Sequence, residues 1–597
     1  MTLIYTILAA AVLFAAGYGV FRRYNMGLAR NSRGQQLRRY LLGAIQAVLP
    51  MAVAGVTALT AMPASAAMLT ALMWIATYNI LYDKTHRSSS PDYDNHMDIA
   101  FGIYLYGWLS ALHLVLAWVS PVAAAIVTGL AEALLMAVPL AQMAYYAAYG
   151  VCIDDAGMAP LLNTYLSEAV EFAKSFGKAK VAAAACALLA VVAGCVAANA
   201  HSGAACGMAW WQLAANAALL LYFSVYIWKP RHGLFVRCGV VALYIDVRNY
   251  NISLRRYRTG MEQRLASLVV KTNVASDKPH TIMMVIGESA CRDYMSAFTP
   301  QPFDTTPWES RMRADGTHFM FYDNAYSCAM QTVPSLERVL TERNQYNGKD
   351  FSDSCSIVDI ARRAGYTVSW FSNQSYIGIN DTSVTLVANT SDTATWVKKV
   401  GGAQQFDTSL IGFLDTIDPS RNNFVVLHLK GSHFNYSNRY PASYAAANGL
   451  HSGDDVECYR NSIHFTDSVL RQFYTKASQR LNLHAMVYFS DHGGIPDMRR
   501  SPRFLGFKMV RIPMWIYLSD QYQRLHPAAT EALRQHTGSY FTNDLVYELM
   551  CGIMDVDSNH YDKRQSLASA QYKYTRADLL TYDGRIRIQD DDLDTKA

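Results

Sequence analysis

Apolar residues are distributed unevenly along the chain, with long uninterrupted runs before about Trp228 and short ones after it. The long runs carry few or no charges, and each approaches or exceeds the ~20 residues that an α-helix needs to cross a bilayer. They are Leu3–Phe21, Leu41–Met62, Ala66–Tyr82, Ile99–Val119, Val122–Val151, Ala179–Ala198 and Trp210–Trp228. This pattern predicts a polytopic α-helical membrane domain over residues 1–228.

Two polar segments interrupt the long runs. Arg22–Arg39 holds six arginines and no acid, which predicts a cytoplasmic location by the positive-inside rule. Cys152–Lys178 is amphipathic and predicts either a helix at the membrane surface or a plain connecting helix. Four apolar runs separate the two segments. If all four crossed the membrane, the arginine cluster and the amphipathic segment would lie on the same side of it. We expect that one run within Leu41–Tyr82 does not cross and that the N-terminus lies outside; the alternative is that the arginine cluster lies outside.

Residues 229–278 read as a polar linker with bridging helices, and short apolar stretches alternate with helix-length patterns after it. The short stretches are apolar without strict alternation, as strands buried on both faces are. They are His280–Ser289, Tyr366–Asn373, Asn423–His433, Ala485–Gly494 and Arg511–Ser519. The helical patterns between them are Asp353–Ala364, Thr408–Ile417 and Asp454–Ala477. Strand alternating with helix predicts an α/β domain with a mainly parallel sheet over residues 279–597.

Polar side chains stand where three of the expected strands end. The first stretch ends in Glu288 and Ser289, the third contains His428 and ends in His433, and the fourth ends in Asp491 and His492 with two glycines. Ligands of such domains bind at the carboxyl ends of the strands. Carboxylate oxygens and imidazole nitrogens are ligands that Zn²⁺ prefers outside thiolate sites. The sequence therefore predicts a metal site at this edge of the sheet.

A candidate nucleophile precedes another helical pattern, in the stretch Thr332-Val333-Pro334-Ser335. Pro334 fits the first turn of a helix, which places Thr332 at or near the helix N-terminus. There the helix dipole and free backbone N–H groups favour anions. A nearby divalent metal would make the threonine hydroxyl a competent nucleophile. The local sequence equally allows that Thr332 only caps the helix.

These motifs together resemble a known family. "VIGES" with Arg292-Asp293, the threonine before a helix, "HLKGSHFNYSNRYP" (His428–Pro441) and "FSDHGG" follow one another as in membrane-bound phosphoethanolamine transferases. Those enzymes modify lipopolysaccharide, at lipid A or its core, and belong to the alkaline phosphatase/sulfatase superfamily. The stretch "YYAAYG…LLNTYLSEAVEF" also resembles their loop near the lipid donor. The resemblance covers most of the chain and is strongest in the second half.

The resemblance implies that Glu288, Thr332, Asp491 and His492 bind Zn²⁺, with Thr332 also the nucleophile. His433 would lie beside the transferred phosphate, as an acid/base or as a ligand of a second zinc ion. The other residues that it implies near the substrate are Asn163, Thr164, Glu168, His428, Asn373, Tyr436 and Arg439. Thr332 would attack the phosphorus of phosphatidylethanolamine, diacylglycerol would leave, and the threonine-bound group would pass to a lipopolysaccharide acceptor. The family further implies a monomer in the bacterial inner membrane, with several spans and a periplasmic catalytic domain.

The sequence departs from the family at two points. Many members read "SDHGE", whereas Gly494 stands at the acidic position here, and "IPDMRRSPRFLGF" lacks a further histidine that members often carry. A second zinc site is therefore in doubt, and Arg499 or Arg500 are candidate phosphate clamps instead. A sulfatase is disfavoured because threonine cannot become the formylglycine nucleophile of those enzymes. A phosphoglycerol transferase acting on a surface glycan and a non-catalytic glycolipid sensor stay as alternatives.

Charge and cysteine content add two further expectations. The formal net charge of +5 includes the arginine cluster, and no compact basic face with interleaved aromatic residues follows, so no nucleic-acid partner is expected. The chain has ten cysteines without CxxC or zinc-ribbon spacing. In an oxidising compartment one or two disulfides are expected, with connectivity left open, among Cys291, Cys328, Cys355, Cys458 and Cys551.

Overall fold

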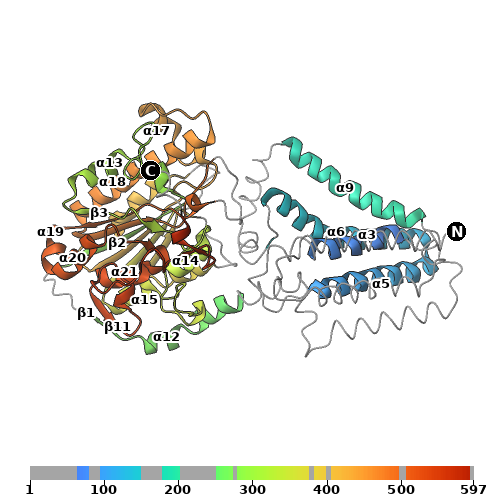
Figure 1. The fold of residues 1–597 in the computed structure, drawn as a ribbon, viewed down its shortest axis with the longest axis horizontal. Coiled ribbons are helices and arrows are strands. Elements are labelled where there is room, and N and C mark those ends of the chain that lie inside the picture. Colours follow the sequence, from blue (N-terminus) through green and yellow to red (C-terminus); the bar gives the residue numbers. More distant parts are fainter. Residues whose placement is uncertain are drawn as a thin grey trace. The chain divides into compact units, whose positions relative to one another are not determined.

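The computed structural model divides into two compact units, Met1–Asn249 and Tyr250–Ala597. It describes residues 64–78, 95–149, 153, 178–201, 251–272, 278–374, 382–397, 405–496 and 506–591. The figure draws these parts as coloured ribbon (Figure 1).

The described part of the first unit consists of helices. They are α3 (Ala64–Ala76), α5 (Asn95–Val119), α6 (Pro121–Tyr149) and α9 (Lys178–His201). The apolar runs expected at 99–119, 122–151 and 179–198 fall on the last three, and α3 overlaps the run at 66–82. Within the described ranges, one helical stretch, Pro121–Ala147, is long and apolar enough by composition to cross a membrane. The runs at 3–21, 41–62 and 210–228, the arginine cluster and residues 154–177 of the amphipathic segment Cys152–Lys178 lie outside the described residues.

The second unit is built on a seven-stranded mixed sheet, with the strand order β3-β9-β8-β2-β7-β5-β6. The five expected strands are present as β2 (Thr281–Gly287), β5 (Thr367–Ser372), β7 (Asn423–His428), β8 (Leu483–Ser490) and β9 (Met514–Leu518). Two further strands that the sequence analysis did not identify, β3 (Phe319–Phe321) and β6 (Thr393–Trp396), form its edges. The pairs β2–β7, β2–β8, β5–β7 and β5–β6 are parallel. β9 runs antiparallel to both β8 and β3.

Helices cover both faces of this sheet (Figure 1). Alternate side chains of β2 enter two different cores, because successive residues of a strand point to opposite faces. Met284 packs in a core with residues of α14 (Thr332–Val339), α15 (Ile357–Arg363) and α21 (Val546–Ile553). Met283 packs in the opposite core, which α13 (Pro307–Asp315) and α18 (Asp455–Arg480) also line. Strands buried on both faces explain the continuous apolar runs in the sequence.

Local sequence signals fix the ends of several helices. Asp454 caps α18 by accepting a hydrogen bond from the N–H of Glu457. Ser356 and Asp359 form a capping box at the start of α15. The helix expected over Thr408–Ile417 is instead a 3₁₀-helix, η5 (Asp407–Thr416). The prediction of a helical segment there was correct, but its type was wrong.

Shorter elements complete the second unit. α12 (Met261–Ser267) and β1 (Val270–Thr272) precede the sheet, and β1 pairs with β11 (Val556–Ser558). The remaining helices are α16 (Ser383–Ala388), α17 (Ala442–Ala447), α19 (Asp520–Leu525) and α20 (Pro527–Gln535). The other short pairs are β4 (Ala325–Tyr326) with β10 (Phe541–Thr542), and β12 (Leu580–Thr581) with β13 (Ile586–Arg587).

The expectation of disulfides in this unit was wrong. All of its cysteines are free and buried, namely Cys291, Cys328, Cys355, Cys458 and Cys551. They lie inside the packed cores as small apolar side chains, which is a common role of cysteine. Hydrophobic burial on both sides of the sheet therefore holds this unit together without crosslinks.

Candidate metal centre and nucleophile

Three adjacent parallel strands deliver the predicted polar residues to one edge of the sheet. β8, β2 and β7 are neighbours, and their carboxyl ends lead into Asp491–His492, Glu288 and the turn before His433, respectively. The prediction that these strand ends converge is confirmed. Their side chains, however, do not all join one cluster.

Glu288, Asp491 and His492 form a buried group whose ligand-type atoms all lie within 4.8 Å of one another. Nε2 of His492 is 3.6 Å from Oε1 of Glu288 and 3.4 Å from Oδ2 of Asp491. The three side chains are at most 1% exposed. Two buried carboxylates beside an imidazole are a donor set suited to zinc.

The histidine is oriented for metal binding. Its Nδ1–H donates to the backbone carbonyl of Gly493, with 2.7 Å between the two atoms. That bond fixes the tautomer in which Nε2 carries the lone pair, and Nε2 is the atom that faces the two carboxylates. Metal-binding histidines commonly hold their second nitrogen in this way.

One carboxylate oxygen of Asp491 accepts no hydrogen bond. Oδ1 of Asp491 accepts hydrogen bonds from the backbone N–H groups of Ser289 (2.9 Å) and His492 (2.7 Å). Oδ2 is buried and has no hydrogen-bond partner. Burial, with the nearby charge of Glu288, raises the pKa of the Asp491 carboxyl well above its ordinary value. A cation bound here would satisfy Oδ2 and offset both charges, so these residues fit a zinc ion.

Thr332 is the first residue of α14 and points at the same group. Its hydroxyl donates to Oε2 of Glu288 at 3.0 Å, and Oγ1 lies 3.5 Å from Nε2 of His492. Gln331 is the N-cap residue, and α14 has no side-chain cap. The hydroxyl therefore does not cap the helix, which was the alternative reading. Thr332 is half-buried, so a substrate can reach its hydroxyl oxygen, although the side chains of Glu288, Asp491 and His492 beside it are buried.

A network behind the site fixes α14 against the end of β8. The carbonyl oxygen of Asp491 accepts hydrogen bonds from the hydroxyls of Ser327 (2.6 Å) and Ser335 (2.7 Å), and from Nδ2 of Asn543 (2.8 Å). Ser335 belongs to α14, one turn after Thr332. This network sets the position of the candidate nucleophile relative to the carboxylates.

Sequence reasoning missed a contact of Glu288 that comes from the end of β5. Nε2 of Gln374 donates to Oε2 of Glu288 (3.2 Å) and to the carbonyl of Leu429 (2.6 Å). Nζ of Lys430 donates to Oε1 of the same glutamine at 3.3 Å. Gln374 directly follows the expected strand Tyr366–Asn373, so its place after a strand end was the available signal.

The structure places two predicted substrate residues in supporting roles around the turn after β7. Nδ2 of Asn373 donates to Oδ1 of Asp407 (2.8 Å), and the carboxylate of Asp407 accepts the backbone N–H groups of Lys430 (2.8 Å) and Gly431 (2.9 Å). Asn373 thus helps to hold the turn. His428 lies in β7, 3% exposed, with its Nε2 unpartnered. Burial lowers the pKa of its imidazole to about 4, so it is neutral.

The remaining predicted residues of this segment follow the turn. The backbone N–H of His433 donates to the carbonyl of Lys430 at 3.2 Å, and its imidazole is not part of the three-residue cluster. Tyr436 begins the 3₁₀-helix η6 (Tyr436–Asn438) and packs its ring against Tyr459. Arg439 is half-buried at the end of η6.

Other predicted residues cannot be placed from the described part of the chain. Asn163, Thr164 and Glu168 lie outside it, and so do Arg499 and Arg500.

The glycine that departs from the family pattern lies in a crowded position. A Cβ atom at Gly494 would be 2.9 Å from the carbonyl oxygen of Ser289 and 2.9 Å from the hydroxyl of Tyr459. That hydroxyl in turn donates to the same carbonyl at 2.6 Å. A side chain at position 494 would therefore displace the backbone that directly follows Glu288.

Comparisons with known proteins agree with the fold of the second unit. Residues 280–551 match the model of the sulfatase family. The phosphoethanolamine transferase EptC of Escherichia coli K12 is 22% identical over 78% of this chain and 86% of its own length. The structure of its C-terminal periplasmic domain covers 55% of this chain and 97% of that chain, with 22% identity and a TM-score of 0.50. The integral membrane protein lipooligosaccharide phosphoethanolamine transferase A from Neisseria meningitidis covers 86% of this chain and 97% of that chain, with 16% identity and a TM-score of 0.53. Residues 280–551 are therefore similar to the sulfatase family, and the chain is related to the phosphoethanolamine transferases.

Proposed function

We propose that this protein is an enzyme that transfers phosphoethanolamine from phosphatidylethanolamine to a lipopolysaccharide acceptor, either lipid A or a core sugar. The observation that carries the proposal is the Thr332 hydroxyl, held 3.0 Å from Oε2 of Glu288 and 3.5 Å from Nε2 of His492. A half-buried nucleophile beside a zinc-type ligand set is what phosphoryl transfer through a covalent intermediate requires.

Glu288, Asp491, His492 and Oγ1 of Thr332 would hold one zinc ion. Bound there, the ion would lower the pKa of the threonine hydroxyl and offset the negative charge on the phosphoryl oxygens. The hydrogen bond that Nδ1–H of His492 donates to the carbonyl of Gly493 keeps Nε2 of His492 free of a proton for this purpose. One ion is the number that these residues support.

The reaction proceeds by two displacements. Oγ1 of Thr332 forms a bond to the phosphorus, the bond from phosphorus to the diacylglycerol oxygen breaks, and diacylglycerol leaves with a proton. The Thr332 hydroxyl donates to Oε2 of Glu288, and its proton passes through an acid/base group to the departing diacylglycerol oxygen, so that the proton balance of this step closes. An acceptor oxygen then attacks the same phosphorus, and the bond to Oγ1 breaks, which restores the threonine. His433, at the half-buried turn after β7, is the candidate acid/base for these proton transfers.

The donor is a membrane lipid, which fits a chain with a long apolar first half. We assign residues 1–228 to a multi-pass domain in the bacterial inner membrane, 229–278 to a linker and 279–597 to a periplasmic catalytic domain. Asn163, Thr164 and Glu168, on the amphipathic segment, would contact the ethanolamine or acceptor groups. Asn373, His428, Tyr436 and Arg439 would shape the site from the side of β7.

The proposal is tested with the full-length protein in detergent, given fluorescently labelled phosphatidylethanolamine and purified lipopolysaccharide. We expect labelled diacylglycerol to be released and a phosphoethanolamine group to be added to the acceptor, as read by mass spectrometry of its lipid A and core fragments. Thr332→Ala abolishes both, whereas Gln331→Ala, at the neighbouring position outside the ligand set, retains them. Release of labelled phosphatidic acid in place of diacylglycerol, or transfer by the Thr332→Ala protein, would refute the proposal.

A further inference from the structure

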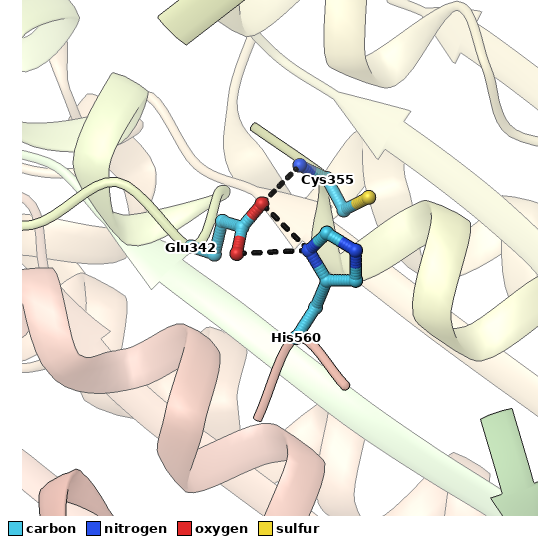
Figure 2. A group of neighbouring side chains, drawn as sticks. All are labelled: Glu342, Cys355 and His560. Atoms are coloured by element: carbon cyan, nitrogen blue, oxygen red, sulfur yellow. Dashed lines mark hydrogen bonds and ion pairs between the residues drawn. The ribbon is translucent and has the colours of Figure 1, made fainter. Parts of the chain in front are cut away.

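A second group of metal-ligand residues lies away from the candidate active site. It consists of Glu342, Cys355 and His560, whose ligand-type atoms all lie within 4.8 Å of one another. Figure 2 shows the Cys355 side chain and the His560 ring on the same side of the Glu342 carboxylate. These residues come from three separate segments: the stretch after α14, the stretch before α15 and the stretch after β11.

Backbone contacts hold two of the three ligands in place. The N–H of Glu342 donates to the carbonyl of Cys355 at 3.0 Å, and the N–H of Cys355 donates to Oε1 of Glu342 at 3.0 Å. Residues 341 and 356 form an antiparallel bridge beside them. Nδ1 of His560 lies 2.9 and 3.0 Å from the two carboxylate oxygens. These contacts place Glu342 beside Cys355 and bring the imidazole of His560 to the Glu342 carboxylate.

We propose that Glu342, Cys355 and His560 form a second binding site for a zinc-type divalent ion. Thiolate, imidazole and carboxylate are the three protein ligand types of zinc, and three such ligands are enough for a tetrahedral site completed by water or by the second carboxylate oxygen. Glu342 and Cys355 are buried, whereas the His560 side chain is 17% exposed. The imidazole thus lies at the side from which an ion can enter.

Lys349 is the internal competitor for this site. Its ammonium group pairs with Oε2 of Glu342, while its own side chain is 44% exposed. The lysine can therefore turn outward to solvent when a divalent cation takes its place on the carboxylate. The alternative is that Glu342, Cys355, His560 and Lys349 bind no metal. Lys349 would then stay paired with Glu342 in an ion-pair network.

An ion at this site would act on the catalytic half of the molecule through α14. Glu342 lies three residues after the end of α14, the helix that begins with Thr332. By joining Glu342 to Cys355 and to His560, the ion would tie the end of this helix to the start of α15 and to the segment after β11. Its role would be structural, because none of the three ligands belongs to the cluster around Asp491.

The test uses Co²⁺ as a spectroscopic probe of the full-length protein in detergent. The candidate active-site ligands contain no sulfur, so a thiolate-to-cobalt charge-transfer band in the near ultraviolet cannot come from that site, and variants of single cysteines show which thiolate gives it. We expect the band in the wild type and its loss in Cys355→Ser. Cys458→Ser removes a buried cysteine from a different core cluster and is the matched control that retains the band.

Lys349→Ala separates the metal site from a simple ion-pair network. Removing the competing charge should tighten cobalt binding roughly tenfold, the size expected for one partly exposed unit charge. A network without metal affinity would instead lose stability and show no band. Absence of the band in the wild type and in Lys349→Ala, or its persistence in Cys355→Ser, overturns the proposal. Neither result bears on transfer through Thr332, which is measured separately.

Discussion

A buried pair of carboxyl groups beneath the active-site edge gives a pH-dependent prediction. Glu309 and Asp467 are 1% and 2% exposed, and both line a pocket that Glu288 also lines. Asp467 accepts the backbone N–H groups of Trp308 (2.9 Å) and Glu309 (2.8 Å). Oε1 of Glu309 accepts the indole N–H of Trp515 at 2.6 Å, and its Oε2 has no partner. Burial, together with the charge of Asp467, raises the pKa of Glu309 well above its ordinary value.

Glu309→Gln removes the titrating group and keeps its shape and the oxygen that Trp515 contacts. Because the pKa of Glu309 is raised in the folded state, the wild type loses stability as the pH rises from about 4.5 towards the raised pKa. Each pH unit in that window corresponds to about 1.4 kcal/mol. At pH 7 the amide should therefore stabilise the fold by up to about 3 kcal/mol, and near pH 4.5 by almost nothing.

The assay is urea unfolding of the full-length protein in detergent at pH 5 and pH 7.5, followed by tryptophan fluorescence. Trp308 and Trp515 have ring centroids 5.7 Å apart and report directly on the surroundings of the pair. Glu262→Gln, at an exposed position of α12, is the matched control and should change the free energy of unfolding by a few tenths of a kcal/mol at both pH values. A stabilisation by Glu309→Gln that is the same at pH 5 and pH 7.5, or a loss of stability at pH 7.5, would refute the reasoning.

Three further perturbations test the surroundings of the nucleophile. Gln374→Ala removes the amide that holds Oε2 of Glu288, so zinc affinity should fall by about 10–100-fold; a zinc titration of transfer activity should show lost activity restored by excess metal, and unchanged affinity would contradict the role. Gly494→Ala puts a Cβ 2.9 Å from the carbonyl of Ser289, and thermal unfolding should show a loss of about 1–3 kcal/mol, whereas wild-type stability would show that the backbone has room. Chelation of zinc should abolish transfer reversibly, with Zn²⁺ restoring it; full activity in a chelated sample verified as metal-free would contradict the ligand assignment.

The sequence predicted the strands at the centre of the site because those strands are buried on both faces. β2, β7 and β8 carry uninterrupted apolar runs, and each ends at a polar residue or a turn. The parallel order of these neighbours then brings Glu288, Asp491 and His492 together. The reversed direction of β9 could not be predicted, since strand direction depends on the connection and not on the apolar pattern.

Other features depended on tertiary contacts that local patterns do not encode. Gln374 meets Glu288 only because β5 lies two strands from β2 in the sheet. The free cysteines differ from the expectation because each is enclosed within packed side chains, and sequence gives no distance between thiols. The crowding at Gly494 comes from Ser289 and Tyr459, residues far away in the sequence. The sequence identified the candidate residues Glu288, Thr332, Asp491 and His492, whereas the contacts that orient them required the fold.

The central claim is that Thr332 carries the phosphoethanolamine group between donor and acceptor. It is tested most directly by mass spectrometry of the full-length protein incubated with phosphatidylethanolamine in the absence of acceptor. We predict a phosphoethanolamine adduct on the peptide that contains Thr332, absent from Thr332→Ala and discharged when lipopolysaccharide is added. An adduct on another residue, or transfer to lipopolysaccharide by a protein that never forms the adduct, would contradict the account.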